Sequence, residues 1–524
     1  MIVRDVGEYS VGTLTEASFE GRHQSTQSAN TVGGGEAMKL RYLAVLLGLG
    51  MATGVMPLGV YAQTPTPEPD MVAPDVEIES ETEVEAEAEP EEAEPGLTAI
   101  GAYNQGVERY NSRDYEAALA AFDMAIEKDP TLAGAYLYRG LIYADQNNYD
   151  RALIDLNQAL DLDPDNANAL FARGSVYYRQ GNSTEAQADF NAALEANPDA
   201  VDAYLYRGLI DSQQGRNDLA LEDFSTAIEL DPDNPSAYVL RGFALERVNN
   251  YSDAVADFSR AIELQGDLPR AYMGRGVAYY QLGLYDAALD DLNQAVRLDS
   301  SMARAYLNRS YVYYRQGRPT RALQDLDRAI ELNPDLTEAY MSRGTIRAAQ
   351  DNLGGAQQDF ARVLQLNPDS AMAYKQKGDA LLQAGDATAA IADYTEALIL
   401  DPAYASAFKA RGDARLSTGD VFGAIDDYSQ ALEAQPDYLE AYSARGAAYL
   451  QVNQAQDAYQ DLTQAIVSAP NSADPKLFYN RGVVRARLGD DAGARRDFEQ
   501  AAQLYLQQGE AAGYRQTLNQ MSQL

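Results

Sequence analysis

A glycine returns every 34 residues along most of this 524-residue chain, and this period constrains the fold more than any other feature. Within each period, apolar residues recur at intervals of three and four, which places their side chains on one face of an α-helix. A short helical pair cannot bury its apolar face alone, whereas stacked pairs bury it between neighbours. The period therefore predicts an all-α solenoid. The glycines are Gly106, Gly140, Gly174, Gly208, Gly242, Gly276, Gly344, Gly378, Gly412 and Gly446, with Ser310 at the one interruption.

Other residue types recur at fixed distances from this glycine. An aromatic residue precedes it by four, an alanine follows by twelve, Phe, Tyr or Leu by sixteen and often a proline by twenty-four, as in Tyr136, Gly140, Ala152, Leu156 and Pro164. The residue before a proline disfavours the α region, so this proline ends the second helix. The pattern resembles the tetratricopeptide repeat, a 34-residue helix-turn-helix. The resemblance implies a right-handed superhelical solenoid that binds other proteins.

The repeat boundaries follow from the register of the glycines. We expect about twelve units covering residues 99–508, and a last amphipathic helix over 509–524 with Tyr514, Leu518 and Met521 on the side that covers the final unit. The units begin at residues 99, 133, 167, 201, 235, 269, 303, 337, 371, 405, 439 and 475.

The first hundred residues have a different composition. Residues 38–62 carry two positive charges, then an apolar stretch and small residues before Gln63, which is typical of a secretory signal peptide starting at Met38. An uncleaved membrane anchor is the alternative, because about 19 residues can just span a bilayer. Residues 1–37 are then an upstream extension, expected to be disordered. Both alternatives place the repeats outside the cytoplasmic membrane, in the periplasm or another extracytoplasmic compartment, where an uncleaved anchor would tether them.

Residues 63–98 form an acidic linker that is rich in proline and glutamate. Thirteen acidic residues and no Lys or Arg lie between Gln63 and Gly96, so charge repulsion predicts a disordered segment. The interpretation as a spacer is favoured, and binding of a basic partner is the alternative. The formal net charge of the chain is −38, which argues against nucleic acid and anionic lipid as partners.

Composition also excludes most kinds of catalytic site. The chain has no cysteine, and its only histidine is His23, in the upstream extension. Disulfides, thiolate chemistry, Ser-His-Asp triads and His or Cys metal sites are therefore excluded from the repeats. Adjacent acids such as Asp290 and Asp291 point in different directions on a helix and are interpreted as solvated. We expect no catalysis, no metal, no cofactor and no small-molecule substrate.

A charged pair recurs with the same period. The residue before the repeat glycine is Arg or Lys in eleven units, and an Asp stands sixteen residues further on; the first unit lacks both. Joint presence and absence predict a structural salt bridge that joins helices of one unit or of neighbouring units. The pairs include Arg139 with Asp155, Arg207 with Asp223, Arg241 with Asp257, and Arg275 with Asp291.

The resemblance also implies where a partner binds. In this family the first helix of each unit lines a concave groove, with positions two, five, nine, twelve and thirteen of the unit facing into it. The alternative for each residue is that it belongs to the core and the register is misread by one position. The expected groove residues are Leu137, Phe171, Tyr178, Leu205, Phe243, Met273, Tyr280, Leu307, Tyr311, Tyr314, Met341, Lys375 and Lys409.

Two lysines make part of this groove charged. Lys375 and Asp379, like Lys409 and Asp413, stand four residues apart, a spacing that permits pairing along one helix. The family's clamp for the C-terminal carboxylate of chaperones needs Asn where Asp379 and Asp413 stand, so binding of chaperone tails is not expected.

The features above predict a non-catalytic scaffold or adaptor that binds peptide or helical segments of other proteins. A structural subunit of an envelope assembly, export or secretion complex is the first alternative. A regulatory enzyme with unrecognised activity is the second. Contact with a membrane is expected only through an uncleaved N-terminal anchor.

Overall fold

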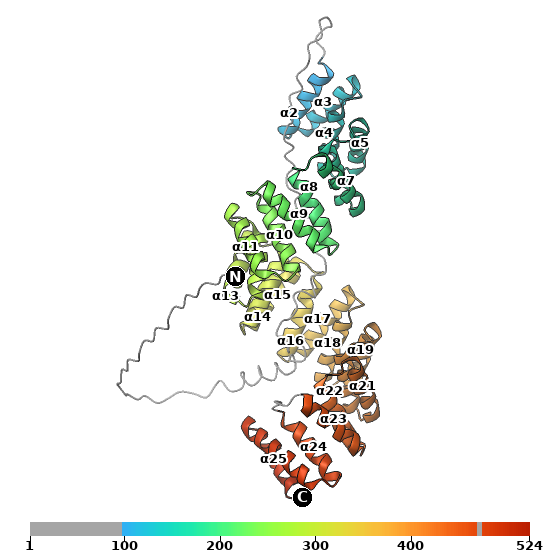
Figure 1. Ribbon diagram of the computed structural model, residues 1–524, viewed down its shortest axis with the longest axis vertical. Helices are drawn as coiled ribbons and strands as arrows, with labels where there is room; N and C mark the ends of the chain where they lie inside the picture. Colours follow the sequence, from blue (N-terminus) through green and yellow to red (C-terminus); the bar gives the residue numbers. More distant parts are fainter. Residues whose placement is uncertain (1–96, 469–473) are drawn as a thin grey trace, which may run out of the picture. The chain divides into compact units, whose positions relative to one another are not determined.

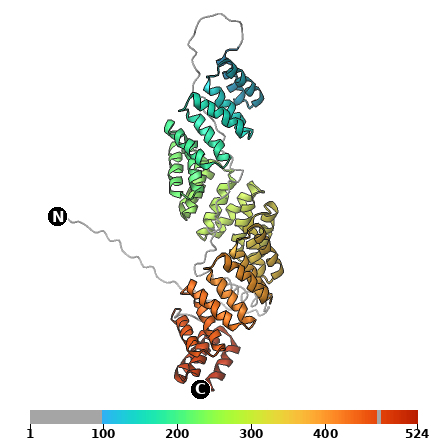
Figure 2. The same cartoon turned by 90° about the vertical axis from the view of Figure 1, so that its right-hand side faces the viewer.

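The computed structural model describes residues 97–468 and 474–524, which lie within one structural unit, residues 57–524. The described residues form 25 helices and no strand, so the predicted all-α solenoid of helical pairs is confirmed. Figures 1 and 2 show the pairs following one another in chain order. The segments predicted at 1–37 and 38–62, and the linker predicted at 63–98 except for its last two residues, lie outside the described residues.

The first helices of the twelve pairs each span thirteen residues and begin at the unit starts given above. Thirteen residues correspond to a rod of about 20 Å. These helices are α2 (Ala99–Asn111), α4 (Ala133–Asp145), α6 (Ala167–Arg179), α8 (Val201–Gln213), α10 (Pro235–Arg247), α12 (Pro269–Gln281), α14 (Ala303–Arg315), α16 (Thr337–Ala349), α18 (Ala371–Gln383), α20 (Ala405–Ser417), α22 (Leu439–Gln451) and α24 (Pro475–Arg487).

The second helices are one residue longer, except for the last, and each packs on its own first helix and on the next pair. They are α3 (Tyr115–Lys128), α5 (Tyr149–Leu162), α7 (Ser183–Ala196), α9 (Asn217–Leu230), α11 (Tyr251–Leu264), α13 (Tyr285–Leu298), α15 (Pro319–Leu332), α17 (Leu353–Leu366), α19 (Ala387–Leu400), α21 (Val421–Ala434), α23 (Ala455–Ser468) and α25 (Asp491–Gln508).

The repeat glycine is explained by the close approach of the two helices of a unit. A Cβ atom at Gly242 would lie 2.8 Å from the ring of Phe258, and one at Gly106 would lie 2.5 Å from the ring of Phe122, closer than real Cβ contacts. Ser310 replaces glycine where the opposing residue is Leu326, and its buried Oγ donates to the carbonyl of Leu307 at 2.6 Å. The glycine therefore makes room for the large side chain of the second helix.

The turn inside every unit contains one residue with left-handed backbone geometry. It is the fifteenth residue of each of the twelve units, and glycine occupies it in seven, with φ between 70° and 89°. Left-handed geometry costs little for glycine and more for other residues. The other five units place Arg113, Asn147, Asn249, Asp351 and Asn453 there, with φ between 57° and 64°.

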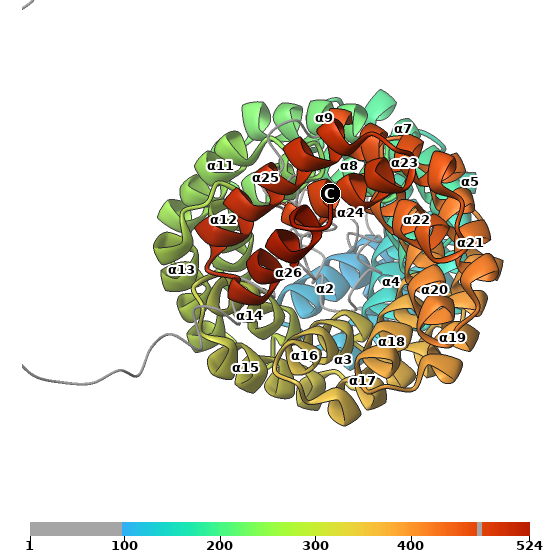
Figure 3. The ribbon, with the colours of Figure 1, turned by 90° about the horizontal axis from the view of Figure 1, so that it is seen from below.

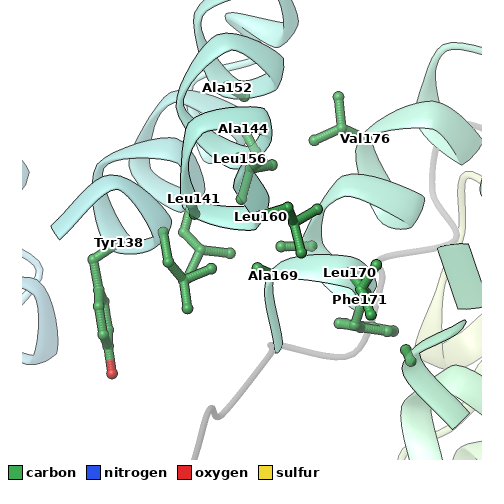
Figure 4. Packing of buried hydrophobic residues seen from close by; sticks show 14 of the residues in the cluster. Tyr138, Leu141, Ala144, Ala152, Leu156, Leu160, Ala169, Leu170, Phe171 and Val176 are labelled. Carbon is green, nitrogen blue, oxygen red and sulfur yellow. The ribbon is translucent and has the colours of Figure 1, made fainter. Parts of the chain in front are cut away.

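The core runs continuously from unit to unit. In the second unit Ala152 and Leu156 of α5 are fully buried, and Figure 4 shows Leu156 and Leu160 between the side chains of α4 and those of α6. Ala169 of α6 completes this layer. Because each layer takes side chains from two units, stability depends on nearest neighbours.

The last helix, α26 (Ala511–Met521), packs against α25. The prediction that Tyr514, Leu518 and Met521 cover the final unit is partly wrong. Thr517 is fully buried, with its Oγ1 donating to the carbonyl of Gly513 at 2.7 Å, while Leu518 is 40% exposed. Gly513 lies against the ring of Tyr505 and sets this rotation, because a side chain there would meet the ring.

Candidate functional site

The first helices lie on the inner side of the array and the second helices on the outer side. Figure 3 shows this for α12 and α13, and for α14 through α21 taken in pairs. We call the residues at unit positions two, nine, twelve and thirteen of α6, α8, α10, α12 and α14 the inner face. These positions recur at intervals of seven, three and one, and so they share one side of each helix.

Six of the expected groove residues do not belong to an exposed surface. Each of them is at most 8% exposed, so their assignment to the groove is wrong. Position five explains most of these errors, because it points between the second helix of its own unit and the first helix of the next: Leu307 packs with Leu326 and Ala339. The six residues are Leu137, Phe171, Leu205, Tyr280, Leu307 and Met341.

Tyr280 stands at position twelve and is buried for a different reason. It packs with Leu292 and Val312, and its hydroxyl accepts a hydrogen bond from Nε of Arg315 at 3.2 Å. Burial raises the pKa of Tyr280 above its ordinary value. Arg315 belongs to the next unit, so this tyrosine contributes to the junction between two units.

The remaining aromatic residues of the expected groove are half-buried on the inner face. The hydroxyl of Tyr178 accepts from Nε2 of Gln213 at 2.7 Å, and the ring of Phe243 packs edge-on against Phe258 at 5.0 Å between centroids. Met273 lies at position five of its unit, outside the inner face as defined, and is also half-buried. Tyr311 accepts from Oγ of Ser342 at 3.3 Å. These side chains present aromatic edges and polar atoms side by side.

The inner face also carries arginines. The guanidinium of Arg270 lies 5.6 Å from the centre of the Phe243 ring, and Nη1 of Arg247 donates to the carbonyl of Ser212 at 3.1 Å. Burial raises the pKa of Tyr178, while the charge of Arg270 from α12 acts to lower it. Sequence reasoning missed these arginines because it assigned groove residues only at unit positions five, nine and twelve, whereas Arg270 stands at position two and Arg247 at position thirteen.

The two lysines of the expected groove belong to a repeated polar network. Nζ of Lys375 lies 2.7 Å from Asp379, whose other oxygen accepts from the Tyr394 hydroxyl at 2.9 Å. Lys409 and Asp413 repeat this arrangement with Tyr428, at 2.6 Å and 2.8 Å. Burial, together with the negative charge of Asp379, raises the pKa of Tyr394. The lysines are therefore engaged within their own helices, as the spacing permits.

The structure brings each predicted arginine and aspartate together. Arg139 donates from Nε and Nη2 to the two oxygens of Asp155 at 2.8 Å and 2.7 Å, and this geometry recurs in Arg207–Asp223, Arg241–Asp257 and Arg275–Asp291. The aspartates are buried. Hydrogen bonding to Asp155 raises the pKa of Arg139.

A third contact of these arginines was not predicted. Nη1 of Arg241 donates to Oγ of Ser225, sixteen residues earlier on the preceding second helix, at 3.2 Å. Arg275 makes the same contact with Ser259 at 3.0 Å, and Arg139 with Asp123 at 2.6 Å. Each of these three arginines therefore joins three helices across two units. A search for polar residues sixteen positions before each arginine would have found these acceptors.

No group of His, Cys, Asp or Glu that could hold a metal ion occurs among the residues that the structure describes. Within the same residues, no helix is both long and apolar enough to cross a membrane. The inner face, with its aromatic and arginine side chains, is the candidate site that these residues offer for recognition of another polypeptide.

Solenoids of helical pairs with such an inner face form a recognisable class, and comparison with known families identifies it. The tetratricopeptide repeat matches residues 171–235, 239–303, 285–337 and 341–405, and a second description, TPR repeat, matches residues 140–181 and 412–453. The chain belongs to the tetratricopeptide-repeat family. A search of curated proteins finds no match.

Solved structures of the same family resemble parts of this chain. A tetratricopeptide repeat protein from Parabacteroides merdae is 21% identical, covering 48% of this chain and 98% of its own, with a TM-score of 0.41. YrrB, described as a TPR protein with an unusual peptide-binding site, is 28% identical over 36% of this chain and 98% of its own, with a TM-score of 0.32. A chain of the APC/C hetero-tetramer Cut9–Hcn1 is 12% identical over 81% and 96%, with a TM-score of 0.44.

Proposed function

We propose that this protein is a non-catalytic scaffold outside the cytoplasmic membrane that binds a segment of a partner protein along the inner face. The observation that carries the proposal is the row of half-buried Tyr178, Phe243, Tyr311 and Tyr314, four aromatic side chains on first helices of units three to seven. Aromatic residues contribute large contact area at low entropic cost, and arginine and tyrosine are enriched where protein partners bind most strongly. The signal-peptide pattern of residues 38–62 supports the location.

The experiment is affinity capture of the tagged protein from its own cells, with mass spectrometry of the partners and of the mature N-terminus. The test variant replaces Phe243, Tyr311 and Tyr314 by alanine. Because all three are half-buried on the inner face, we expect loss of captured partner with only a small change in the melting temperature. A mature chain that begins at Gln63 would support export.

The matched control removes comparable apolar area from the outer helices. Ile154, Ile399 and Phe422 are each at least 66% exposed on second helices, and their replacement by alanine is expected to leave capture unchanged. Equal loss of partner in both triple variants, or none in either, would contradict binding along the inner face. Turnover of a substrate by the purified protein would contradict the non-catalytic assignment.

A further inference from the structure

Glu246 is an acid of the inner face that has a buried oxygen without a hydrogen-bond donor. It stands at position twelve of α10, three residues after Phe243, and its side chain is half-buried. Oε1 of Glu246 is enclosed and accepts no hydrogen bond from any residue that the structure describes. Most buried polar atoms in native proteins are hydrogen-bonded, so an exception calls for a physical explanation.

The junctions between units show which hydrogen bond is missing. At four other junctions, position twelve accepts a hydrogen bond from position thirteen of the following unit. These bonds run from Gln213 to the Tyr178 hydroxyl at 2.7 Å, from Arg247 to the Ser212 carbonyl at 3.1 Å, from Arg315 to the Tyr280 hydroxyl at 3.2 Å, and from Arg487 to the Leu450 carbonyl at 2.9 Å. At the junction of units five and six, the same two positions hold Glu246 and Gln281. Oε1 of Glu246 therefore remains open to a donor from another molecule.

Among the described residues, no positive charge compensates the Glu246 carboxylate. Arg247, the next residue, reaches back to the Ser212 carbonyl in unit four. Burial alone raises the pKa of Glu246 well above its ordinary value, whereas a neighbouring cation would lower it. The titratable neighbour is Tyr251 at the start of α11, whose pKa is raised by burial and by the negative charge of Glu246. A cation from another molecule would therefore meet no competitor for this carboxylate in the described part of the chain.

The surroundings of Glu246 suit a long cationic side chain. The half-buried ring of Phe243 shares the inner side of α10 with Glu246. Lysine and arginine carry apolar stems that pack along such surfaces while their charged heads reach a polar group. Hydrogen bonds between ionised groups are about twice as strong as those between neutral groups. Pairing with an amine or a guanidinium therefore stabilises the ionised carboxylate that burial alone disfavours.

We propose that Glu246 determines the specificity of the inner face by pairing with a lysine or arginine side chain of the bound partner segment. The stem of that side chain lies against Phe243, and its charged head takes the place that position thirteen fills at the four other junctions. This inference rests on the proposed function and deepens it, because it names the chemistry of the segment that binds. Recognition of a cation also explains why the chain keeps an unpaired acid at a cost in stability.

Selection of peptides tests the proposal. Random dodecapeptides displayed on phage are selected on the immobilised full chain, on Glu246→Gln and on Glu229→Gln, at about pH 8, so that the carboxyl is ionised when a cation binds. Glu246→Gln keeps the shape of the side chain and removes its charge, while Glu229→Gln removes an exposed charge from the outer helix α9. We expect lysine and arginine to be enriched on the parent and on Glu229→Gln, and not on Glu246→Gln. Equal enrichment on all three proteins would overturn the proposal.

The affinity of one selected peptide measures the strength of the pairing. Replacing its enriched basic residue by norleucine keeps an apolar stem and removes the charge, so binding to the parent should weaken by roughly 10-fold to 100-fold. The same replacement should change binding to Glu246→Gln by no more than about twofold. Equal losses on both proteins would show that the basic residue binds elsewhere and would overturn the proposal.

The pH dependence separates pairing with a cation from donation by a protonated carboxyl. The carboxyl is protonated in the unbound protein and ionised in the complex, so binding releases a proton. Affinity for the parent should therefore rise with pH, by up to about tenfold per pH unit below the raised pKa, and affinity for Glu246→Gln should not follow this rise. An affinity for the parent that falls as pH rises would overturn the proposal, since a protonated carboxyl would then be the donor.

Two further outcomes separate this inference from the proposed function. If the alanine variant of Phe243, Tyr311 and Tyr314 loses the selected peptides while Glu246→Gln binds them like the parent, only the inference on Glu246 fails. If the aromatic variant binds them like the parent, or if the parent selects no peptide, the proposed function fails as well. Glu246→Gln removes a buried charge that has no partner, so it should be at least as stable as the parent, and unfolding would not explain its loss of binding.

Discussion

The ring of Phe258 leaves no space for a Cβ atom at Gly242, and this contact explains why one residue type recurs through the chain. The same collision would occur at Gly208 against Phe224 and at Gly344 against Phe360. Ser310 shows that the next smallest polar side chain fits where a leucine replaces the ring and the hydroxyl finds a carbonyl. This position therefore requires a residue of small volume.

We expect Gly242→Ala to destabilise the protein by about 1–3 kcal/mol, because the added methyl overpacks the interface of the two helices. Gly354→Ala is the control: this glycine is also helical, in α17, and has no atom within 4 Å of its added Cβ. Alanine there should be neutral or stabilising by up to about 1 kcal/mol. Chemical denaturation measures both, and a Gly242→Ala variant as stable as the parent would contradict the overpacking.

Glu246 predicts a pH dependence. Burial raises the pKa of the Glu246 carboxyl in the folded chain. The folded chain therefore keeps a proton that the unfolded chain releases once the pH exceeds the ordinary pKa of 4.5. Stability from this group is therefore greatest at low pH and falls as pH rises through the raised pKa. Glu246→Gln removes the charge. We therefore expect it to raise the free energy of unfolding by about 1–3 kcal/mol at about pH 8, seen as a higher melting temperature, and to change it little near pH 4.

The exposed Glu229 of α9 is the control for that measurement, since Glu229→Gln removes the same charge from a side chain that is not buried. A gain in stability for Glu246→Gln that is equal at both pH values would show that the effect comes from packing and not from the proton.

At the scale of the helical pair, the left-handed residue of the turn sets the angle at which one helix returns along the other. Most units place Gly or Asn there, both of which tolerate this geometry. Arg113 in the first unit does not, and its φ of 60° places strain between α2 and α3. The first unit is therefore expected to be the least stable pair of the N-terminal half.

We expect Arg113→Gly to stabilise the α2–α3 pair by about 1 kcal/mol, since a left-handed residue with a Cβ costs roughly 1–2 kcal/mol. Hydrogen exchange of amides in α2 and α3 reports this local stability. Asn147→Gly in the second unit should have a smaller effect, because asparagine adopts this geometry more readily. Equal protection gains in both variants would contradict an origin in backbone strain.

The elements were predictable because one periodic pattern specifies them many times over. The helix starts follow the glycine register, and the arginine and aspartate pairs were found because both members recur together. Position five could not be assigned in the same way. Leu307 looks the same in sequence whether it faces a groove or a neighbouring unit, and only the packing of three helices decides.

The third contact of each arginine was missed for a related reason. Its acceptor varies among aspartate, asparagine, serine and threonine, as in Asp123, Asn191, Ser225 and Thr395, so no single residue type recurs. The arginines of the inner face, such as Arg247 and Arg270, were missed because they stand at unit positions thirteen and two, which other units fill with other residue types. The acceptor of the third contact is therefore a polar side chain in these units, although its residue type differs from unit to unit.

At the scale of the whole array, the pair of a basic residue and an aspartate recurs in units two to twelve, and its contacts are reduced at the ninth unit. Lys377 replaces arginine there and reaches only Oδ1 of Asp393, at 2.9 Å. Oδ2 of Asp393 is buried and accepts no hydrogen bond from the described residues. Ala361 stands where the acceptor of the third contact is found in other units. The joint between units eight and nine is therefore held by fewer polar contacts.

We expect Lys377→Arg to stabilise the array by about 1 kcal/mol, because the planar guanidinium can donate to both oxygens of Asp393. Adding Ala361→Ser should increase the gain by providing the third acceptor. Arg411→Lys is the reverse change in the next unit and should lose stability. Denaturation followed by circular dichroism measures all three, and a loss for Lys377→Arg would show that the space there fits only lysine.

An arginine that makes both contacts, such as Arg241, reaches sixteen residues forward and sixteen residues back, and the two spans together are two short of one repeat. A copy of the gene segment for one repeat, inserted in register at a unit boundary, would therefore carry every donor to a new acceptor of the same kind. An insertion of another length would move the acceptor of the third contact away from its arginine at that junction. At the last junction, where the unit starts at 439 and 475 lie 36 residues apart, Ala465 stands sixteen residues before Arg481 and offers no side-chain acceptor. The third contact thus favours growth and shrinkage of the array in steps of 34 residues, and it makes duplication the simplest route by which this chain reached its length.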